Sequence, residues 1–219
     1  MLREINLDEI SDGRLYSSND MAKTDCKGCD GCSACCHGMG NSIVLDPLDV
    51  YRLSTNLSKS VNELLTGPLE LNVVDGIILP NLKMARSEEA CSFLDTNGRC
   101  TVHAFRPGIC RMFPLGRFYE NRSFQYFLQV HECPKTDRSK VKIKKWLDTP
   151  NQSRNHDFLC KWHYLLNDVE EKVRGQEDSE YAKKLNMSLL TLFYFNESDT
   201  EEDFYRKFEE KWNRFREGI

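Results

Sequence analysis

The sequence predicts an α+β fold, in which a small cysteine-rich domain with short hairpins and helices is followed by a helical C-terminal extension. Two observations carry this prediction. Nine of the ten cysteines lie between residues 26 and 133, where short apolar runs alternate with turn signals. From about residue 153 the apolar residues recur at helical spacing instead. We therefore divide the chain into a polar leader (1–25), a cysteine-cluster domain (26–150) and a helical extension (151–219) packed on it.

Two short helices are expected soon after the first cysteines, and the leader is expected to hold one more. Asp46-Pro47 combines an N-cap acid with a proline at the first helical position. Ser60-Val-Asn-Glu63 has the spacing of a capping box, and Gly67-Pro68 should end that helix.

Three hairpins should follow. The turns are Asp75-Gly76, the segment Asp95–Gly98 and the segment Glu120–Arg122. The expected strand pairs are 69–74 with 77–82, 92–94 with 99–102, and 115–120 with 123–130.

Three amphipathic helices are expected in the extension. Gly175 should close the first of them. Packing onto the domain is the ordinary explanation of their apolar stripes, and a groove for a partner is the alternative. The stripes are Phe158, Trp162, Leu165, Leu166 and Val169; Tyr181, Leu185, Leu189 and Phe193; and Phe204, Phe208, Trp212 and Phe215.

Composition limits the classes of function. The formal net charge is -4, which gives no general attraction to nucleic acid or to an anionic membrane. The first ten residues do not resemble a signal peptide, and no apolar run reaches the length of a spanning helix. We therefore expect a cytoplasmic protein with an unknown protein partner or substrate, no bound nucleic acid and no membrane contact. In that compartment thiols stay reduced, which disfavours disulfides.

The run from Cys26 to His37 holds five cysteines. The adjacent Cys35 and Cys36 are poorly placed for bridging, so metal binding is the better use of these thiols. The C-x2-C-x2-C-x3-C spacing of bacterial ferredoxins is present, although His37 replaces the proline that follows it there. The same residues could supply half of a zinc site, so spacing leaves the metal open. The cysteines with ferredoxin spacing are Cys26, Cys29, Cys32 and Cys36.

Four more thiols lie downstream. Cys133 is followed by Pro134, a pair that suits the edge of a cluster. Eight thiolates are enough for two four-cysteine sites, and Cys26 is a ninth candidate. The eight are Cys29, Cys32, Cys35, Cys36, Cys91, Cys100, Cys110 and Cys133.

Arginines accompany the downstream thiols. Arg106 and Arg111 bracket Cys110, and we predict that they offset thiolate charge or donate to sulfur around the cofactor. Cys160 falls on a helical stripe and is expected to be a buried structural thiol. Each of three histidines near a cysteine could be a ligand, a hydrogen-bond partner of sulfur or a surface residue. These are His37, His103 and His131.

Several motifs in one order resemble a known family. They are Cys29-Asp-Gly-Cys-Ser-Ala-Cys-Cys36, Cys91-Ser-Phe-Leu, Gly98-Arg-Cys100-Thr-Val-His and Arg106-Pro-Gly-Ile-Cys110-Arg-Met-Phe-Pro114. Over about residues 26–134 the chain resembles the CxxCxxCC, YkgJ-type zinc- or iron-chelating cysteine-cluster family. Flagellin lysine N-methylase is similar over this domain, so the resemblance also implies a protein-modifying role. Cys26 lies outside the short family signature, and the resemblance does not extend to the chain from about residue 150.

These observations favour a metal-binding protein that carries one or two iron–sulfur clusters of the [4Fe–4S] type, with a redox or protein-modifying role. The clustered thiols and nearby arginines favour iron over zinc. The alternatives are a zinc-binding structural or interaction module and an enzyme like the lysine methylase. No catalytic residue can be assigned, and whether the protein is an enzyme stays open.

Overall fold

The α+β prediction is confirmed by the computed structural model, which describes residues 6–26, 32–85, 89–195 and 198–218. The described strands form four two-stranded antiparallel sheets. The helices are α1 (Leu7–Ile10), η1 (Ala34–Cys36), α2 (Pro47–Leu57), α3 (Val61–Thr66), η2 (His103–Phe105), α4 (Gly108–Met112), α5 (Ile143–Leu147), α6 (Gln152–Val173), α7 (Glu180–Tyr194) and α8 (Glu201–Glu217). The strands are β1 (Met21–Asp25), β2 (Leu69–Val74), β3 (Ile77–Leu82), β4 (Met84–Ala85), β5 (Ala90–Cys91), β6 (Leu115–Glu120), β7 (Ser123–Leu128) and β8 (Ser139–Lys142).

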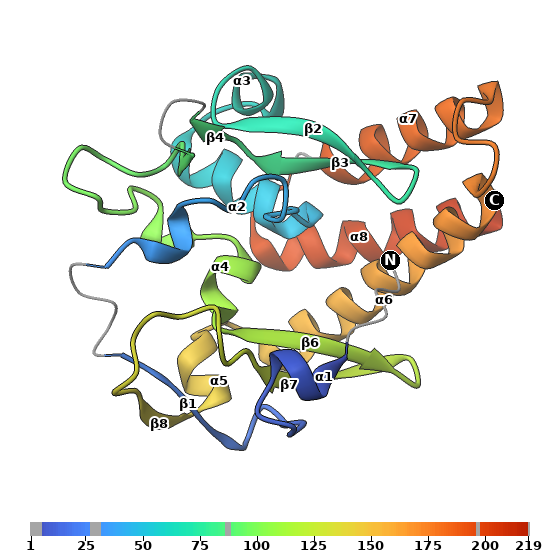
Figure 1. Ribbon diagram of the computed structural model, residues 1–219. Helices are drawn as coiled ribbons and strands as arrows, with labels where there is room; N and C mark the ends of the chain where they lie inside the picture. The colour runs from blue at the N-terminus through green and yellow to red at the C-terminus, as the bar shows by residue number, and fades with distance from the viewer. Residues whose placement is uncertain (1–5, 27–31, 86–88, 196–197, 219) are drawn as a thin grey trace.

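The elements form an upper and a lower layer in the view of Figure 1. The upper layer holds α2, α3, the β2–β3 hairpin, α7 and α8. The lower layer holds α1, α5 and the sheets β1–β8 and β6–β7. Helix α4 lies between the layers, and α6 runs obliquely from the lower layer to the upper one (Figure 1). No helix in the described part of the chain is long and apolar enough to cross a membrane.

Both capped helices are confirmed. The Asp46 side chain accepts a hydrogen bond from the Asp49 N–H at 2.9 Å, and Asp49 accepts one from the Asp46 N–H at 3.3 Å. Ser60 and Glu63 form the same reciprocal pair at the start of α3. Each pair satisfies backbone donors that the first helical turn leaves without partners.

Two of the three predicted hairpins are confirmed, and the third differs. β2 pairs with β3 about Asp75 and Gly76, which both have positive φ. β6 pairs with β7 about residues 121 and 122. In the third case Cys91 pairs with Met84 instead, and Leu94 and Cys100 form a single bridge.

The side chain of Asp95 explains this difference. It accepts hydrogen bonds from the N–H groups of Asn97 and Arg99, both at 2.8 Å. An aspartate that takes up these backbone donors favours a compact turn over a regular strand ladder. The segment therefore closes as a turn that projects Cys100 toward the preceding chain.

The predicted leader packs into the fold. Its segment β1 pairs with β8, more than a hundred residues away in sequence, and Tyr16 bridges to Tyr126 of β7. Ala22 and Tyr16 are buried. These contacts fix the strand that leads into Cys26, which follows β1 directly.

The helical extension packs on the rest of the chain through its aromatic stripes. Phe158, Phe193 and Phe208 are at most 2% exposed, so they form core. The Tyr194 hydroxyl donates to the Leu45 carbonyl at 2.8 Å, and Asn186 caps the β2–β3 turn through Gly76 and Ile78. The extension thereby fixes α2 and β3, which border the functional site.

Candidate metal centre

Thiols from four parts of the chain surround one cavity of about 290 Å³. The run before and within η1 supplies three of them, and β5, the following turn and α4 supply one each. The six cysteines are Cys32, Cys35, Cys36, Cys91, Cys100 and Cys110. Each was predicted as a ligand from the sequence. Cys29 lies outside the described residues.

The backbone joins the first cysteine run to β5. The N–H of Gly38 donates to the Glu89 carbonyl at 2.8 Å, and His37 bridges to Ala90. Gly38 has φ +65°, a conformation that glycine adopts without strain. Within η1, the Cys36 N–H donates to the Ser33 carbonyl at 2.8 Å. These bonds bring Cys35 and Cys36 close to Cys91.

Helix α4 supplies Cys110 from the other side. Its first N–H, on Gly108, donates to Asp49 Oδ1 of α2 at 2.7 Å. Arg111 is buried and donates to the carbonyls of Ala104 at 2.8 Å and Asp148 at 3.3 Å. Arg111 therefore holds α4 in place, and it is not among the described side chains that line the thiol cavity. Its predicted contact with the cofactor stays a prediction.

Arg106 does line the cavity. Its Nη1 contacts the ring of His103 at 2.7 Å and the His103 carbonyl at 3.1 Å. Burial, followed by the charges of Arg106 and Arg111, lowers the pKa of His103. Arg106 therefore places a positive charge and a neutral imidazole beside the sulfurs, as a centre with several thiolates requires.

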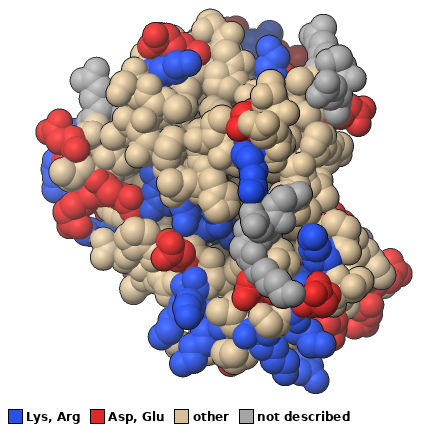
Figure 2. Space-filling view, turned by 90° about the vertical axis from the view of Figure 1, so that its left-hand side faces the viewer, with Lys and Arg blue, Asp and Glu red and all other residues tan. Residues whose placement is uncertain are grey.

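Basic side chains are visible on this side of the molecule. Figure 2 faces the side where η1 and the chain around Cys100 lie in Figure 1. Lys and Arg side chains gather in a hollow across the middle of that face and along its lower edge. Acidic side chains lie on the same face, so its charge is mixed.

Apolar side chains complete the wall. Phe93, Val102 and Trp146 line the cavity, and the indole N–H of Trp146 donates to the Phe113 carbonyl at 3.1 Å. An apolar wall excludes water from the sulfurs and lowers the local dielectric, which strengthens interactions between a metal and thiolates.

The protonation of the thiols follows from their crowding. The Cys36 thiol donates to the Cys35 sulfur, which lowers the pKa of Cys35 to about 7 and raises that of Cys36. Burial raises the pKa values of Cys91, Cys100 and Cys110. In the metal-free protein these three thiols therefore keep their protons at neutral pH.

Metal binding by the metal-free protein is expected to release protons and to tighten as the pH rises. A metal must displace the protons of the thiols with raised pKa values, and fewer protons compete at higher pH. Calorimetric titration of zinc in buffers of different ionisation enthalpy measures this release. A heat of binding that does not depend on the buffer would contradict the prediction.

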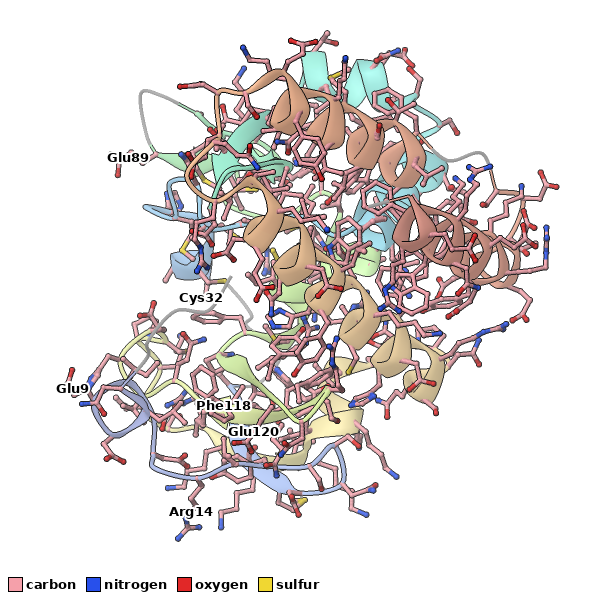
Figure 3. All side chains as sticks on the ribbon, turned by 90° about the vertical axis from the view of Figure 1, so that its right-hand side faces the viewer. Glu9, Arg14, Cys32, Glu89, Phe118 and Glu120 are labelled. Atoms are coloured by element: carbon pink, nitrogen blue, oxygen red, sulfur yellow. The ribbon has the colours of Figure 1, made fainter. Side chains whose placement is uncertain are left out.

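A second, smaller cavity adjoins the first. Its volume is about 30 Å³, and Cys32, Cys35, Phe113 and Trp146 line both cavities. The small cavity adds two further predicted ligands, Cys26 and Cys133. Figure 3 shows Cys32 between the upper and lower parts of the molecule. The eight cysteines in the described part of the domain therefore lie along two neighbouring cavities.

The donor set fits a thiolate-bound metal group. Every predicted thiol ligand within the described ranges lines one of the two cavities, and soft thiolates select zinc and iron–sulfur clusters. Within residues 6–26, 32–85, 89–195 and 198–218, no three His, Cys, Asp or Glu side chains converge as a set on one metal position. The sulfurs surround a space, and their chemistry fits a thiolate-bound metal group.

The remaining cysteine and histidines lie elsewhere or contribute differently. Cys160 is buried on α6, where its sulfur lies 3.9 Å from the His156 ring. His37 is exposed, with its ring 3.4 Å from the Ser33 hydroxyl, and His131 is exposed too. Of the three histidines noted in the sequence, His103 lines the larger cavity.

Comparison with known proteins gives one family. The model of the CxxCxxCC family, described as a putative zinc- or iron-chelating domain, matches residues 28–134. The matched segment contains the six cysteines of the larger cavity together with Cys133. This description supports metal binding in general and does not distinguish zinc from iron. Neither the curated proteins nor the solved structures gave a match.

Proposed function

Because the chain belongs, over residues 28–134, to the CxxCxxCC family of metal-chelating domains, we propose that it is an iron–sulfur protein whose cluster occupies the larger cavity. The observation that carries this proposal is the size of the space that the thiols surround. The cavity has a volume of about 290 Å³, which leaves room for a group larger than one ion. A structural zinc ion, by contrast, is enclosed directly by its four ligands.

The thiols divide between the two cavities. Four thiols line the larger cavity alone. The other four line the smaller cavity, and two of these, Cys32 and Cys35, line the larger cavity as well. We assign the first set to the cluster, because iron–sulfur clusters are held by four thiolates. The first set is Cys36, Cys91, Cys100 and Cys110. The second set is Cys26, Cys32, Cys35 and Cys133.

A cluster in this position would supply one-electron transfer. The side chains of the cavity would tune it. Arg106 would stabilise the reduced, more negative state, while Phe93 and Trp146 would keep water from the sulfurs. Cys35 and Cys36 are neighbours in the chain and direct their sulfurs to different centres in this assignment.

The smaller cavity favours a second candidate function for its own thiols. Its volume of about 30 Å³ is roughly a tenth of that of the larger cavity, which suits a single ion better than a cluster. Four cysteines around one ion are typical of structural zinc. A zinc ion here would tie Cys26, after β1, to Cys133, between β7 and β8.

Metal analysis of protein purified without oxygen tests the proposal. We expect a brown protein with about four iron atoms and a matching amount of acid-labile sulfide per chain, as a [4Fe–4S] cluster requires. Zinc is expected in addition, at up to about one ion per chain, if the smaller site takes it. A colourless protein with zinc as its bound metal would overturn the iron proposal and support the zinc module.

A further inference from the structure

A third cavity, larger than the two thiol cavities, lies between the layers on the other side of α4. Its volume is about 500 Å³, within the range of small-molecule sites. The N-terminal half of α2, the β6–β7 hairpin, α5, the start of α6 and residues 17–19 line it. Gly108 of α4 lines this cavity, whereas Cys110, two residues on, lines the thiol cavity.

Arg117 is the notable side chain of this cavity. It lies on β6 with its guanidinium over the Phe124 ring, 5.4 Å from the centroid. Its Nε is fully buried and has no hydrogen-bond partner among the described residues. Arg117 takes part in none of the ion pairs formed between described side chains. The carboxylates of Asp46 and Asp49 act on its charge without a direct ion pair, so a group that bonds Nε would add to this compensation.

The other charged groups in the wall already have partners. Arg52 makes a two-pronged contact with Glu201, at 3.1 and 2.7 Å. The Asp49 carboxylate accepts from the Gly108 N–H at 2.7 Å, and Asp46 accepts from the Asp49 N–H at 2.9 Å. The Arg117 guanidinium hydrogen-bonds Tyr119 and Tyr126, so its Nε is the donor on this side chain that is left unused among the described residues.

The rim adds donors of the same kind. Lys144 of α5 is exposed and lines the cavity, and the amide side chains of Gln125 and Gln152 lie around it. An arginine at the back, a lysine at the rim and amides between them match a carboxylate or phosphate group. Asp46 and Asp49 line the wall too, so a ligand that also carries an amino or hydroxyl group would find acceptors.

We propose that this cavity binds a small oxyanion-bearing molecule, held by Arg117 at the back and Lys144 at the rim, with its hydroxyl or amino group toward Asp46 and Asp49. The ligand would lie on one side of α4 and the metal centre on the other. The site stands apart from the thiols in its chemistry, so the proposal does not depend on which metal they hold.

Binding to the full chain, purified with its native metal, tests the proposal. The probes are citrate, L-glutamate, inorganic phosphate and the diamine cadaverine, each titrated by calorimetry. We expect citrate or L-glutamate to bind saturably at one site per chain, and cadaverine not to bind. If phosphate binds more tightly than citrate and L-glutamate, the oxyanion is assigned to a phosphate group. If citrate or L-glutamate binds more tightly than phosphate, it is assigned to a carboxylate.

Two variants and a matched control locate the site. Arg117→Gln and Lys144→Gln are each expected to weaken binding by about ten-fold, the scale of one charged hydrogen bond. Lys145→Gln should leave it unchanged, because Lys145 is equally exposed but does not line the cavity. Since Lys144 is exposed, its variant tests the site even if Arg117→Gln fails to fold.

Two results would overturn the proposal. One is that citrate, L-glutamate and phosphate all fail to bind saturably to the metal-loaded protein. The other is that they bind as tightly to Lys144→Gln as to the unaltered chain. Metal content is measured on every sample, so loss of the metal centre is distinguished from loss of this site.

Discussion

Replacing Cys110 with serine is expected to remove the metal group of the larger cavity and to destabilise the protein. Cys110 is the sulfur that α4 contributes, opposite the sulfurs of η1 and β5. A metal group present a thousandfold above its dissociation constant stabilises the folded state by about 4 kcal/mol. Its loss should lower Tm by roughly 8–16 °C for a chain of this size. Metal analysis and calorimetry of the anaerobic protein measure both effects.

The control is Cys160→Ala. Cys160 is as buried as Cys91 but lies on α6, away from both thiol cavities. This variant should keep its full metal content, with a stability loss limited to the small space that the sulfur leaves. Equal metal loss in Cys110→Ser and Cys160→Ala would contradict the assignment of the larger cavity.

Replacing Glu201 with alanine is expected to cost about 3 kcal/mol of stability. Glu201, in the first turn of α8, holds Arg52 of α2 through two hydrogen bonds. The Arg52 side chain is 10% exposed, so removing Glu201 leaves its charge buried without this partner. Chemical denaturation with the metal content held constant measures the change in unfolding free energy.

The neighbouring residue Glu202 provides a matched control. It occupies the same first turn of α8 and pairs with Arg154, but its side chain is 66% exposed and that of Arg154 is 43% exposed. Exposed ion pairs contribute at most about 1 kcal/mol. Glu202→Ala should therefore cost well under 1 kcal/mol, and a loss equal to that of Glu201→Ala would show that burial of Arg52 is not the cause.

Much of the fold could be predicted from local signals. The capping pairs at Asp46 and Ser60 fixed two helix starts, and Asp75-Gly76 fixed a hairpin with its register. The third hairpin is reduced to a single bridge, between Leu94 and Cys100, because the Asp95 side chain accepts hydrogen bonds from backbone N–H groups of the turn. Sequence spacing alone does not show whether the backbone N–H groups of a turn will bond to a side chain or to the opposite strand.

The candidate ligands could be predicted because nine cysteines lie between residues 26 and 133, and cysteines grouped in this way have few uses other than metal binding when thiols stay reduced. The division of these cysteines between two cavities could not be predicted. It depends on the pairing of β1 with β8 and on the hydrogen bond from Gly38 to Glu89, and both join segments that are far apart in the sequence. Arg111 shows the limit of arguments from proximity. It lies next to Cys110 in sequence, yet it donates to the backbone at Ala104 and Asp148.

The oxyanion cavity left no signal in the sequence. Asp46 was visible as a helix cap, and Arg117 lies among the arginines of the cysteine-bearing segment. Asp46, Asp49 and Arg117 meet because α2 packs beside the β6–β7 hairpin through Gly108. That the Nε of Arg117 has no hydrogen-bond partner among the described residues could be found only from the structure.

Mössbauer spectroscopy of anaerobic protein, from cells grown on the Mössbauer-active iron isotope, tests the central claim most directly. The account predicts the spectrum of a thiolate-bound iron–sulfur cluster. It also predicts that Cys110→Ser changes or abolishes that spectrum while Cys160→Ala leaves it unchanged. A spectrum of iron bound only by nitrogen and oxygen would contradict the iron–sulfur proposal. Protein that lacks iron and holds zinc in the larger thiol cavity would contradict it too.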